Sequence, residues 1–346
     1  MKTSFRDGRL GLGRMAGALG VSLGILATGL GAPSVAHAEG KLRIAEQFGI
    51  VYLLLNVVRD QQLVEKYGKQ SGVDINVEWT QLSGGSSVND ALLSGSIDIA
   101  GAGVGPLLTV WDRTHGRQNV KGVASLGNFP YYLLSNNPKV KTIADFTEKD
   151  RIALPAVSVS VQSRFLQMAA AKQWGEKEFN RLDKYTVAIP HPDATAALLA
   201  GGTELNAHFS NPPFQYQALA NKDVHIVLNS YDVIGPNSPT VLFATEKFRK
   251  ENPKTYKAFQ DALKEAEVFI KNNKEAAADT YLRVTKAKAD RDLLIKIISD
   301  PQVEFSTVPK NTYPMAEFLN RVGAIKNKPA SWKDYFFDDA LVTGGS

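Results

Sequence analysis

A short phrase that occurs twice constrains the fold of this chain more than any other feature of its sequence. Residues 91–99, Ala-Leu-Leu-Ser-Gly-Ser-Ile-Asp-Ile, are matched in register by residues 197–205, Ala-Leu-Leu-Ala-Gly-Gly-Thr-Glu-Leu. In each copy Ala and Leu favour the end of a helix, Gly supplies the left-handed residue that closes it, and the following apolar residues favour a buried strand. Two equivalent helix-strand units predict two equivalent lobes, although chance is an alternative for so common a phrase.

Strands and helices alternate along the chain, which argues against a chance repeat. Residues 52–69 and 163–172 favour helices, and nearly all of residues 246–300 favour helices as well. Apolar strands are predicted at residues 41–45, 73–79, 120–126, 131–135, 151–154, 185–189 and 224–228. This alternation predicts an α/β fold with largely parallel sheets covered on both faces. Ligands of such sheets bind beyond the carboxyl ends of the strands, so two facing lobes predict a cleft between them.

The first 38 residues have the features of a cleavable export signal. Four basic residues within the first 14 precede an apolar run over residues 15–30, and Ala36-His37-Ala38 supplies the small residues that signal peptidase recognises. We therefore expect a signal peptide over residues 1–38, a mature chain that begins at Glu39, and a periplasmic location. The chain also lacks the cysteine that a lipoprotein requires, so we expect no lipid anchor.

Charge and composition exclude several classes of function. The predicted signal peptide holds three of the five net positive charges, so the mature chain is nearly neutral and we expect no binding to nucleic acid. The absence of cysteine excludes disulfides, zinc–cysteine sites and a cysteine nucleophile. No Gly-x-Ser-x-Gly nucleophile motif is present, and the histidines after residue 38 lack metal-binding spacing. We therefore expect no catalytic residue, no metal and no cofactor.

These features together resemble a known family of exported binding proteins. A first strand leading into Gln47-Phe48-Gly49, a Ser- and Gly-rich loop before the first repeat copy, and a Pro-bearing turn at residues 101–106 are similar to periplasmic solute-binding proteins of ABC importers. The chain resembles the nitrate, taurine and alkanesulfonate branch, which includes binders of a thiamine pyrimidine precursor. The resemblance covers nearly the whole mature chain and is most specific over residues 83–106. The second copy departs from the pattern, with Glu204 where the family has Asp.

The resemblance implies a type II periplasmic binding protein fold, in which two α/β lobes are joined by a two-strand hinge and a helical C-terminal segment packs on lobe one. Lobe one is expected at residues 39–127 and 236–346, and lobe two at residues 128–235. Gly and Pro cluster where the hinge crossings are expected, near residues 125–130 and 231–239. The resemblance also implies a monomer that delivers a small-molecule solute to a membrane permease with its ATPase.

Loops at equivalent places in the two lobes are predicted to form the binding site. Residues 83–87 open a helix, so their hydroxyls and N–H groups can hold a small anion without a lysine, although Ser87 or Asn89 could instead merely cap that helix. Residues 157–162 are the counterpart in lobe two, although their alternating Ser and Val also fit a strand. Aromatic and amide side chains near strand ends suit an organic ligand. The predicted ligand-binding residues are Gln47, Phe48, Tyr52, Ser83, Gly84, Gly85, Ser86, Ser87, Val104, Gly127, Asn128, Ser158, Ser160, Val161, Gln162, Phe209, Asn211 and Tyr231, with Arg164 as a further candidate.

The sequence thus predicts a transport protein that binds its solute by hinge closure and does not transform it. A small sulfonate or related organic anion is the first expectation for the ligand. A neutral aromatic or heterocyclic solute such as a vitamin precursor is the alternative, because the predicted loops are poor in Lys and Arg. An exported enzyme and a ligand-sensing subunit on the same scaffold are alternatives from other classes.

Overall fold

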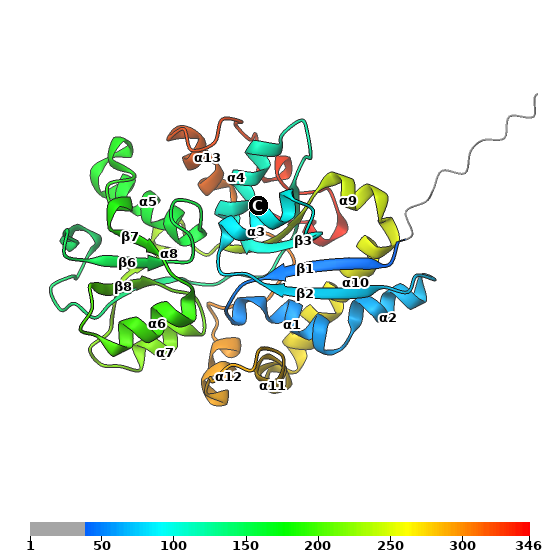
Figure 1. The fold of residues 1–346 in the computed structure, drawn as a ribbon, viewed down its shortest axis with the longest axis horizontal. Coiled ribbons are helices and arrows are strands. Elements are labelled where there is room, and N and C mark those ends of the chain that lie inside the picture. Colours follow the sequence, from blue (N-terminus) through cyan, green and yellow to red (C-terminus); the bar gives the residue numbers. More distant parts are fainter. Residues whose placement is uncertain (1–38) are drawn as a thin grey trace, which may run out of the picture. The chain divides into compact units, whose positions relative to one another are not determined.

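The computed structural model describes residues 39–346, and the predicted signal peptide lies outside these residues (Figure 1). This part of the chain forms two five-stranded sheets. The first sheet contains, in spatial order, β2 (Asn76–Gln81), β1 (Lys41–Glu46), β3 (Ile99–Gly103), β10 (Thr240–Ala244) and β4 (Lys121–Ser125). The second contains β7 (Thr186–Ala188), β6 (Arg151–Leu154), β8 (Leu205–Phe209), β5 (Tyr132–Ser135) and β9 (His225–Asn229). Each sheet with the helices packed on it is called a lobe below.

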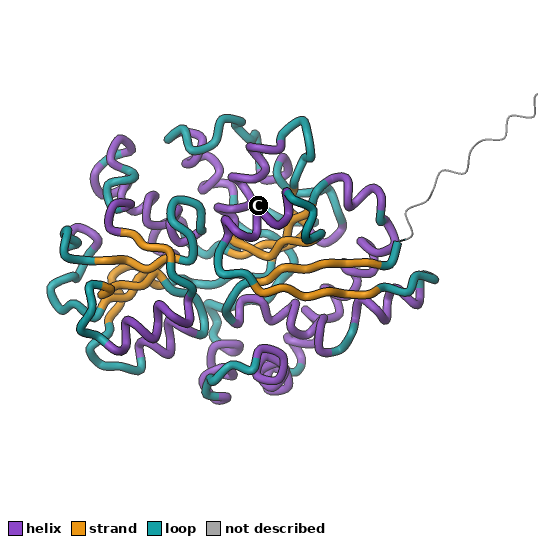
Figure 2. Tube along the Cα trace, in the orientation of Figure 1, coloured by secondary structure: helices purple, strands orange, loops and turns teal. Residues whose placement is uncertain are grey.

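Helices flank each sheet, so the predicted α/β fold with two lobes is confirmed (Figure 2). The helix predicted over residues 52–69 is broken at Gln62, whose φ of +50° is left-handed. The helices are α1 (Leu53–Asp60), α2 (Leu63–Gln70), α3 (Gly85–Leu93), α4 (Val104–Thr114), α5 (Val161–Trp174), α6 (His191–Ala200), α7 (Phe214–Leu219), α8 (Ser230–Ile234), α9 (Glu246–Glu251), α10 (Pro253–Asn272), α11 (Lys274–Thr285), α12 (Arg291–Ser299) and α13 (Tyr313–Arg321). No helix within residues 39–346 is long and apolar enough to cross a bilayer.

The two sheets have the same strand arrangement. β1 pairs in parallel with β2 and β3, and β6 pairs in parallel with β7 and β8. The fourth strand is antiparallel to both of its neighbours in each sheet, as β10 in the first and β5 in the second. Each fourth strand enters directly from the other lobe and so runs against the parallel strands. The prediction of largely parallel sheets was therefore wrong for half of the strand pairs, and β10 was not predicted.

The two copies of the repeated phrase occupy equivalent places in the two sheets. The first copy ends α3, turns at Gly95 with a φ of +73°, and continues into β3. The second copy ends α6, turns at Gly201 and Gly202 with φ of +64° and +71°, and continues into β8. Asp98 of the first copy accepts hydrogen bonds from Arg43 Nε at 2.9 Å and Nη2 at 2.6 Å, which ties the turn to β1. The repeat therefore marks the scaffold of each lobe.

The C-terminal helices cover the first lobe, as the sequence predicts. α10 packs against α1 and α2, and α11 packs against α1. Phe259 and Leu263 of α10 are fully buried there. α13 also contacts α5 of the second lobe, where the rings of Phe318 and Phe179 meet edge to face at 6.2 Å between centroids. The C-terminal segment therefore contacts both lobes.

The chain passes from the first lobe to the second over residues 126–131 and returns over residues 230–239. Residues 303–310 run beside both crossings, because Ser125 N donates to Thr307 O and Ser238 N donates to Lys310 O, each at 2.9 Å. Gly127 has a φ of +132°, and a Cβ at this position would lie 2.0 Å from Glu304 O. Only glycine fits this backbone, so Gly127 is required by the crossing itself. The lobe boundaries after residues 127 and 235 stay predictions.

We expect Gly127→Ala to lower the free energy of unfolding by roughly 3 kcal/mol, because it combines an unfavourable φ with a backbone clash. Urea denaturation followed by circular dichroism measures this change. The control is Gly116→Ala, whose φ is +72° and whose Cβ would have no described atom within 4 Å. This control should cost only about 1 kcal/mol. Equal losses in the two variants would contradict the steric role of Gly127.

Candidate functional site

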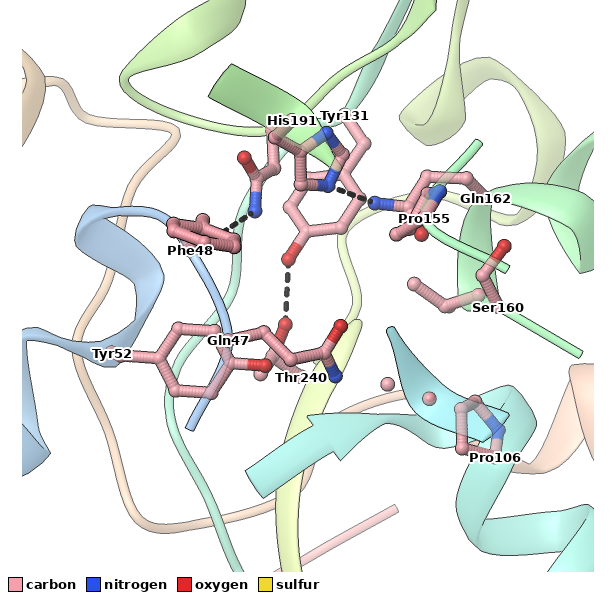
Figure 3. Close-up of a pocket in the computed structure, with 14 residues that line it drawn as sticks. Gln47, Phe48, Tyr52, Pro106, Tyr131, Pro155, Ser160, Gln162, His191 and Thr240 are labelled. Atoms are coloured by element: carbon pink, nitrogen blue, oxygen red, sulfur yellow. Dashed lines mark hydrogen bonds between the residues drawn. The ribbon is translucent and has the colours of Figure 1, made fainter. Parts of the chain in front are cut away.

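A small cavity lies between the two lobes where the carboxyl ends of their parallel strands face each other (Figure 3). Its volume is about 20 Å³, which is room for a single water molecule. The walls come from the segments that follow β1, β2, β3, β6, β7 and β8 and from the starts of β5 and β10. The lining residues are Gln47, Phe48, Tyr52, Gly85, Gly103, Pro106, Tyr131, Pro155, Ser160, Val161, Gln162, His191, Asn211 and Thr240.

Part of the predicted site gathers around this cavity. The loop after β1 contributes three predicted residues, the start of α3 contributes one, the loop before α5 and its first turn contribute three, and the loop after β8 contributes one. These residues are Gln47, Phe48, Tyr52, Gly85, Ser160, Val161, Gln162 and Asn211. The alternative reading of residues 157–162 as a strand was wrong, because Val161 and Gln162 begin α5. Segments from both lobes therefore meet at one place.

The other predicted residues lie outside the cavity lining. Among them are Ser83, Gly84, Ser86, Val104 and Ser158. Ser87 donates its hydroxyl to Gly84 O at 2.8 Å, within the first turn of α3. Phe209 is fully buried beside Phe165, with 6.3 Å between the ring centroids.

Three predicted residues belong instead to the crossings between the lobes. Gly127 packs against Glu304, as described above. Asn128 donates to Glu304 Oε2 at 2.6 Å and accepts from the Ser238 hydroxyl at 2.8 Å. Tyr231 donates its hydroxyl to Gln302 O at 3.0 Å. The side chains of Asn128 and Tyr231 thus connect the crossings to residues 302–304.

Six lining residues were not among the predicted ligand contacts. They are Gly103, Pro106, Tyr131, Pro155, His191 and Thr240. His191 follows the predicted strand at residues 185–189, and a position beyond a strand end was the signal that could have identified it. Thr240 opens the strand that sequence reading missed, so no local pattern pointed to it. Tyr131 and Thr240 share a hydrogen bond of 2.6 Å between their hydroxyl oxygens (Figure 3).

The cavity wall is rich in hydrogen-bond donors although it carries no charge. First-turn N–H groups of a helix lack partners within the helix, and Gly85 of α3 and Val161 and Gln162 of α5 lie in such turns at the wall. The helix dipoles place partial positive charge at the same ends. Within residues 39–346, no Lys, Arg, Asp or Glu lines the cavity, and no three potential metal ligands gather anywhere. The wall therefore suits a small anionic or polar group held by neutral donors.

Two buried histidines hold Gln162 at the wall. Gln162 Nε2 lies 3.1 Å from His191 Nε2, His191 Nδ1 lies 2.8 Å from His208 Nε2, and His208 Nδ1 lies 3.4 Å from Thr195 Oγ1. Burial lowers the pKa of His191 to about 3, and burial together with His191 lowers the pKa of His208 well below its usual range. Both rings are therefore neutral, and the chain of bonds orients the amide of Gln162 without adding charge.

Arg164 belongs to α5, and its side chain packs toward α4 rather than lining the cavity. It is buried, and its Nη1 donates to Gln167 Oε1 at 2.9 Å. Desolvation lowers the pKa of Arg164 to about 10, and the charge of Asp183 opposes this effect. A Cβ on Gly105 would lie 2.9 Å from Arg164 Cγ, so the side chain packs against the start of α4.

Glycines of the first lobe contact the second lobe around the cavity. A Cβ on Gly84 would lie 2.1 Å from Pro155 O, and one on Gly103 would lie 2.7 Å from Val161 Cβ. The loops after β1 and β8 are joined by hydrogen bonds from Ile50 N to Pro212 O at 3.0 Å and from Asn211 Nδ2 to Phe48 O at 3.1 Å. The lobes approach each other to direct backbone contact, which encloses the cavity.

Comparison with known proteins shows the family and the fold. The model of the NMT1-like family matches residues 54–284. No curated protein sequence is significantly similar. The chain resembles the alkanesulfonate-binding protein SsuA from Xanthomonas axonopodis pv. citri bound to MOPS, at 17% identity and a TM-score of 0.66, over 84% of this chain and 95% of that chain. It also resembles the periplasmic nitrate-binding protein NrtA from Synechocystis PCC 6803, at 17% identity and a TM-score of 0.67, over 86% of this chain and 84% of that chain.

A further similar structure is the periplasmic aliphatic sulphonate binding protein SsuA from Escherichia coli, at 17% identity and a TM-score of 0.61. The match covers 86% of this chain and 99% of that chain. At these identities the likeness establishes the architecture, and it confirms the fold predicted from the sequence.

We expect acid to destabilise the protein through its histidine pair. The folded-state pKa of His191 lies below the ordinary value of 6.5, so the pair binds more protons in the unfolded chain, and its contribution to stability falls as the pH drops below about 6.5. Thermal unfolding between about pH 7 and pH 5 measures the slope of the melting temperature. His208→Gln should reduce this slope, whereas the control His115→Gln, at an exposed position, should retain it. Equal slopes in both variants would rule out the pair as the source.

Proposed function

The chain belongs to the NMT1-like family, and we propose that it is the periplasmic solute-binding component of an ABC import system. It captures a small-molecule solute between its lobes and delivers it to a membrane permease with its ATPase. The observation that carries this proposal is the cavity enclosed by strand ends and helix starts from both lobes. The similar alkanesulfonate-, sulphonate- and nitrate-binding proteins support it. The protein acts outside the inner membrane as a monomer.

The character of the cavity wall supports binding without transformation. Across the described residues, its lining has no carboxylate for acid–base chemistry, and its one histidine is neutral and hydrogen bonded. The polar lining groups are amides, hydroxyls and backbone N–H groups, which recognise shape and hydrogen-bonding pattern. The protein therefore holds its solute and does not react with it.

Capture takes place by hinge closure. The cavity has room for about one water, while the lobes meet at Gly49, Gly84, Gly103 and Gly105, so a solute group enters this cavity only when the lobes separate. The motion occurs at the two crossings, residues 126–131 and 230–239. Contacts from both lobes to one solute stabilise the closed form, because neither lobe alone makes all of them.

The solute carries a small anionic group such as a sulfonate. The N-termini of α3 and α5 supply donors and partial positive charge to such a group at the uncharged wall. A neutral heterocycle is the second candidate, and one observation favours it. Within the described residues Asn211 Oδ1 is buried without a hydrogen-bond partner, and this acceptor would oppose an anion but would bind an N–H donor.

Mass spectrometry of solute released from the purified protein tests the proposed function. We expect a small organic anion, and alkanesulfonates should raise the melting temperature in proportion to the logarithm of their concentration. Nitrate, aromatic acids and neutral heterocycles complete the series. A shift with heterocycles alone would reject the sulfonate, and turnover of any released solute would reject the transport function.

Gly84→Ala tests closure. Its added Cβ would meet Pro155 O of the other lobe, so we expect loss of co-purified solute and a larger radius of gyration in solution scattering. The melting temperature of the ligand-free protein should change little, because the φ of Gly84, −167°, suits any residue. The matched control is Gly122→Ala, whose Cβ would lie 2.3 Å from Phe336 within the first lobe. This control should lose about 1–3 kcal/mol of stability but retain the solute. Solute retention by Gly84→Ala would contradict closure at this contact.

A further inference from the structure

A larger groove opens between the lobes beside the inner cavity. Its volume is about 830 Å³, in the range of sites that enclose whole organic ligands. Gln47, Phe48 and Tyr52 line both the groove and the inner cavity. The remaining walls come from α1, α6, α7, α11, the loop before α12 and the first turn of α12, and they include the side chains of Leu199, Phe214 and Leu293. One solute can therefore occupy both spaces.

A buried carboxylate lies in this largely apolar groove. Glu46 ends β1 and is only 5% exposed. Among the described residues it accepts one side-chain hydrogen bond, from Asn56 Nδ2 at 3.2 Å. Its nearest cation is Arg59 at 4.0 Å, and that side chain is half exposed and lies over the ring of Trp79. A carboxylate oxygen pair can accept about four hydrogen bonds, so Glu46 is poorly satisfied for a buried acid.

Asn56 adds a second acceptor to the same wall. It is 1% exposed, and its Oδ1 has no hydrogen-bond partner within residues 39–346. Its Nδ2 donates to Glu46, which assigns the amide orientation and leaves the oxygen as the atom without a partner. Buried amide oxygens almost always have a donor. Glu46 and Asn56 therefore both lack a hydrogen-bond donor. Because Glu46 is negatively charged when ionised, it favours a donor that carries a positive charge.

We propose that this groove binds the body of the transported solute and that a protonated amine of that solute hydrogen bonds to Glu46 and Asn56. The proposal rests on the proposed function, because it names a second recognition point for the same ligand. The aromatic and aliphatic walls bury the organic part of the solute, and the polar head reaches the inner cavity past Gln47, Phe48 and Tyr52. Glu46 thus selects amine-bearing solutes over neutral molecules of the same shape.

The protonation of Glu46 supports this assignment. Burial raises the pKa of Glu46 to about 7, while Arg59 and the hydrogen bond from Asn56 oppose the rise. The other titratable or charged groups facing the groove are Tyr52, Tyr281, Lys288 and Asp290. A cation binds the ionised carboxyl, so amine affinity rises as the pH increases through about 7 and then levels off.

Titration with 2-phenylethylammonium, and with 2-phenylethanol as its neutral analogue, tests the proposal by thermal shift and calorimetry. We expect the ammonium ion to bind the full chain at least about tenfold more tightly at pH 8 than at pH 5.5, and the alcohol to show no pH dependence. Equal binding of the two probes at pH 8 would overturn the assignment of Glu46.

Glu46→Gln removes the charge with little change of shape, and we expect at least about a tenfold loss of ammonium affinity at pH 8. The matched control is Glu317→Gln, the same substitution at an exposed position of α13 that does not line the groove. It should stay within about twofold of the wild type. Should Glu46→Gln fold poorly, the pH series on the unmodified protein decides the question.

The co-purified solute separates this proposal from the function on which it rests. A released amine whose affinity falls in Glu46→Gln supports the proposal. A released solute without an amine, bound equally well by Glu46→Gln, overturns the amine site and leaves solute transport intact. Enzymatic turnover of the released solute overturns both.

Discussion

A hydrogen bond at the ends of the two crossings lies at the cavity wall, and the site is built around it. Tyr131 precedes β5 and Thr240 begins β10, and their hydroxyl oxygens lie 2.6 Å apart. Both strands start at the cavity because each enters its sheet against the direction of the parallel strands. The carboxyl ends of β1 and β3 therefore face those of β6 and β8, and their loops enclose a single space. A ligand in that space touches both lobes.

The two spaces between the lobes differ in polarity. The inner cavity is lined by helix N-termini and neutral side chains, so it offers mainly donors. The groove beside it contains the carboxylate of Glu46 and the unpartnered oxygen of Asn56, so it offers mainly acceptors. Burial makes the inner cavity favour acceptor groups of a ligand, and the groove favour donor groups, more strongly than an exposed surface would. The reason is that water cannot hydrogen bond to a ligand group that lacks a protein partner there. Under the proposed function, neighbouring spaces of opposite preference would select for an asymmetric solute.

Sequence reading located the segments of the site better than the individual side chains. It identified the loop at residues 83–87, but only Gly85 of that loop lines the cavity, since the hydroxyl of Ser87 bonds within its own turn. It also named residues 160–162, and all three line the cavity. It missed Thr240, because a short apolar strand that follows a Pro-rich crossing carries no distinctive period. It also missed Glu46, whose burial depends on α1 and α11, elements far apart in the sequence.

The sequence by itself determined the repeated helix-Gly-strand unit, the family resemblance and the exclusion of cysteine chemistry, because these depend on local propensity and residue type. It also indicated which loops begin helices, since small and hydroxyl residues favour such starts. Only the tertiary structure decided which atoms face the ligand spaces and which polar groups are left without partners. Those properties depend on how closely the lobes approach and how each helix is rotated, and contacts between distant residues such as Gly84 and Pro155 set both.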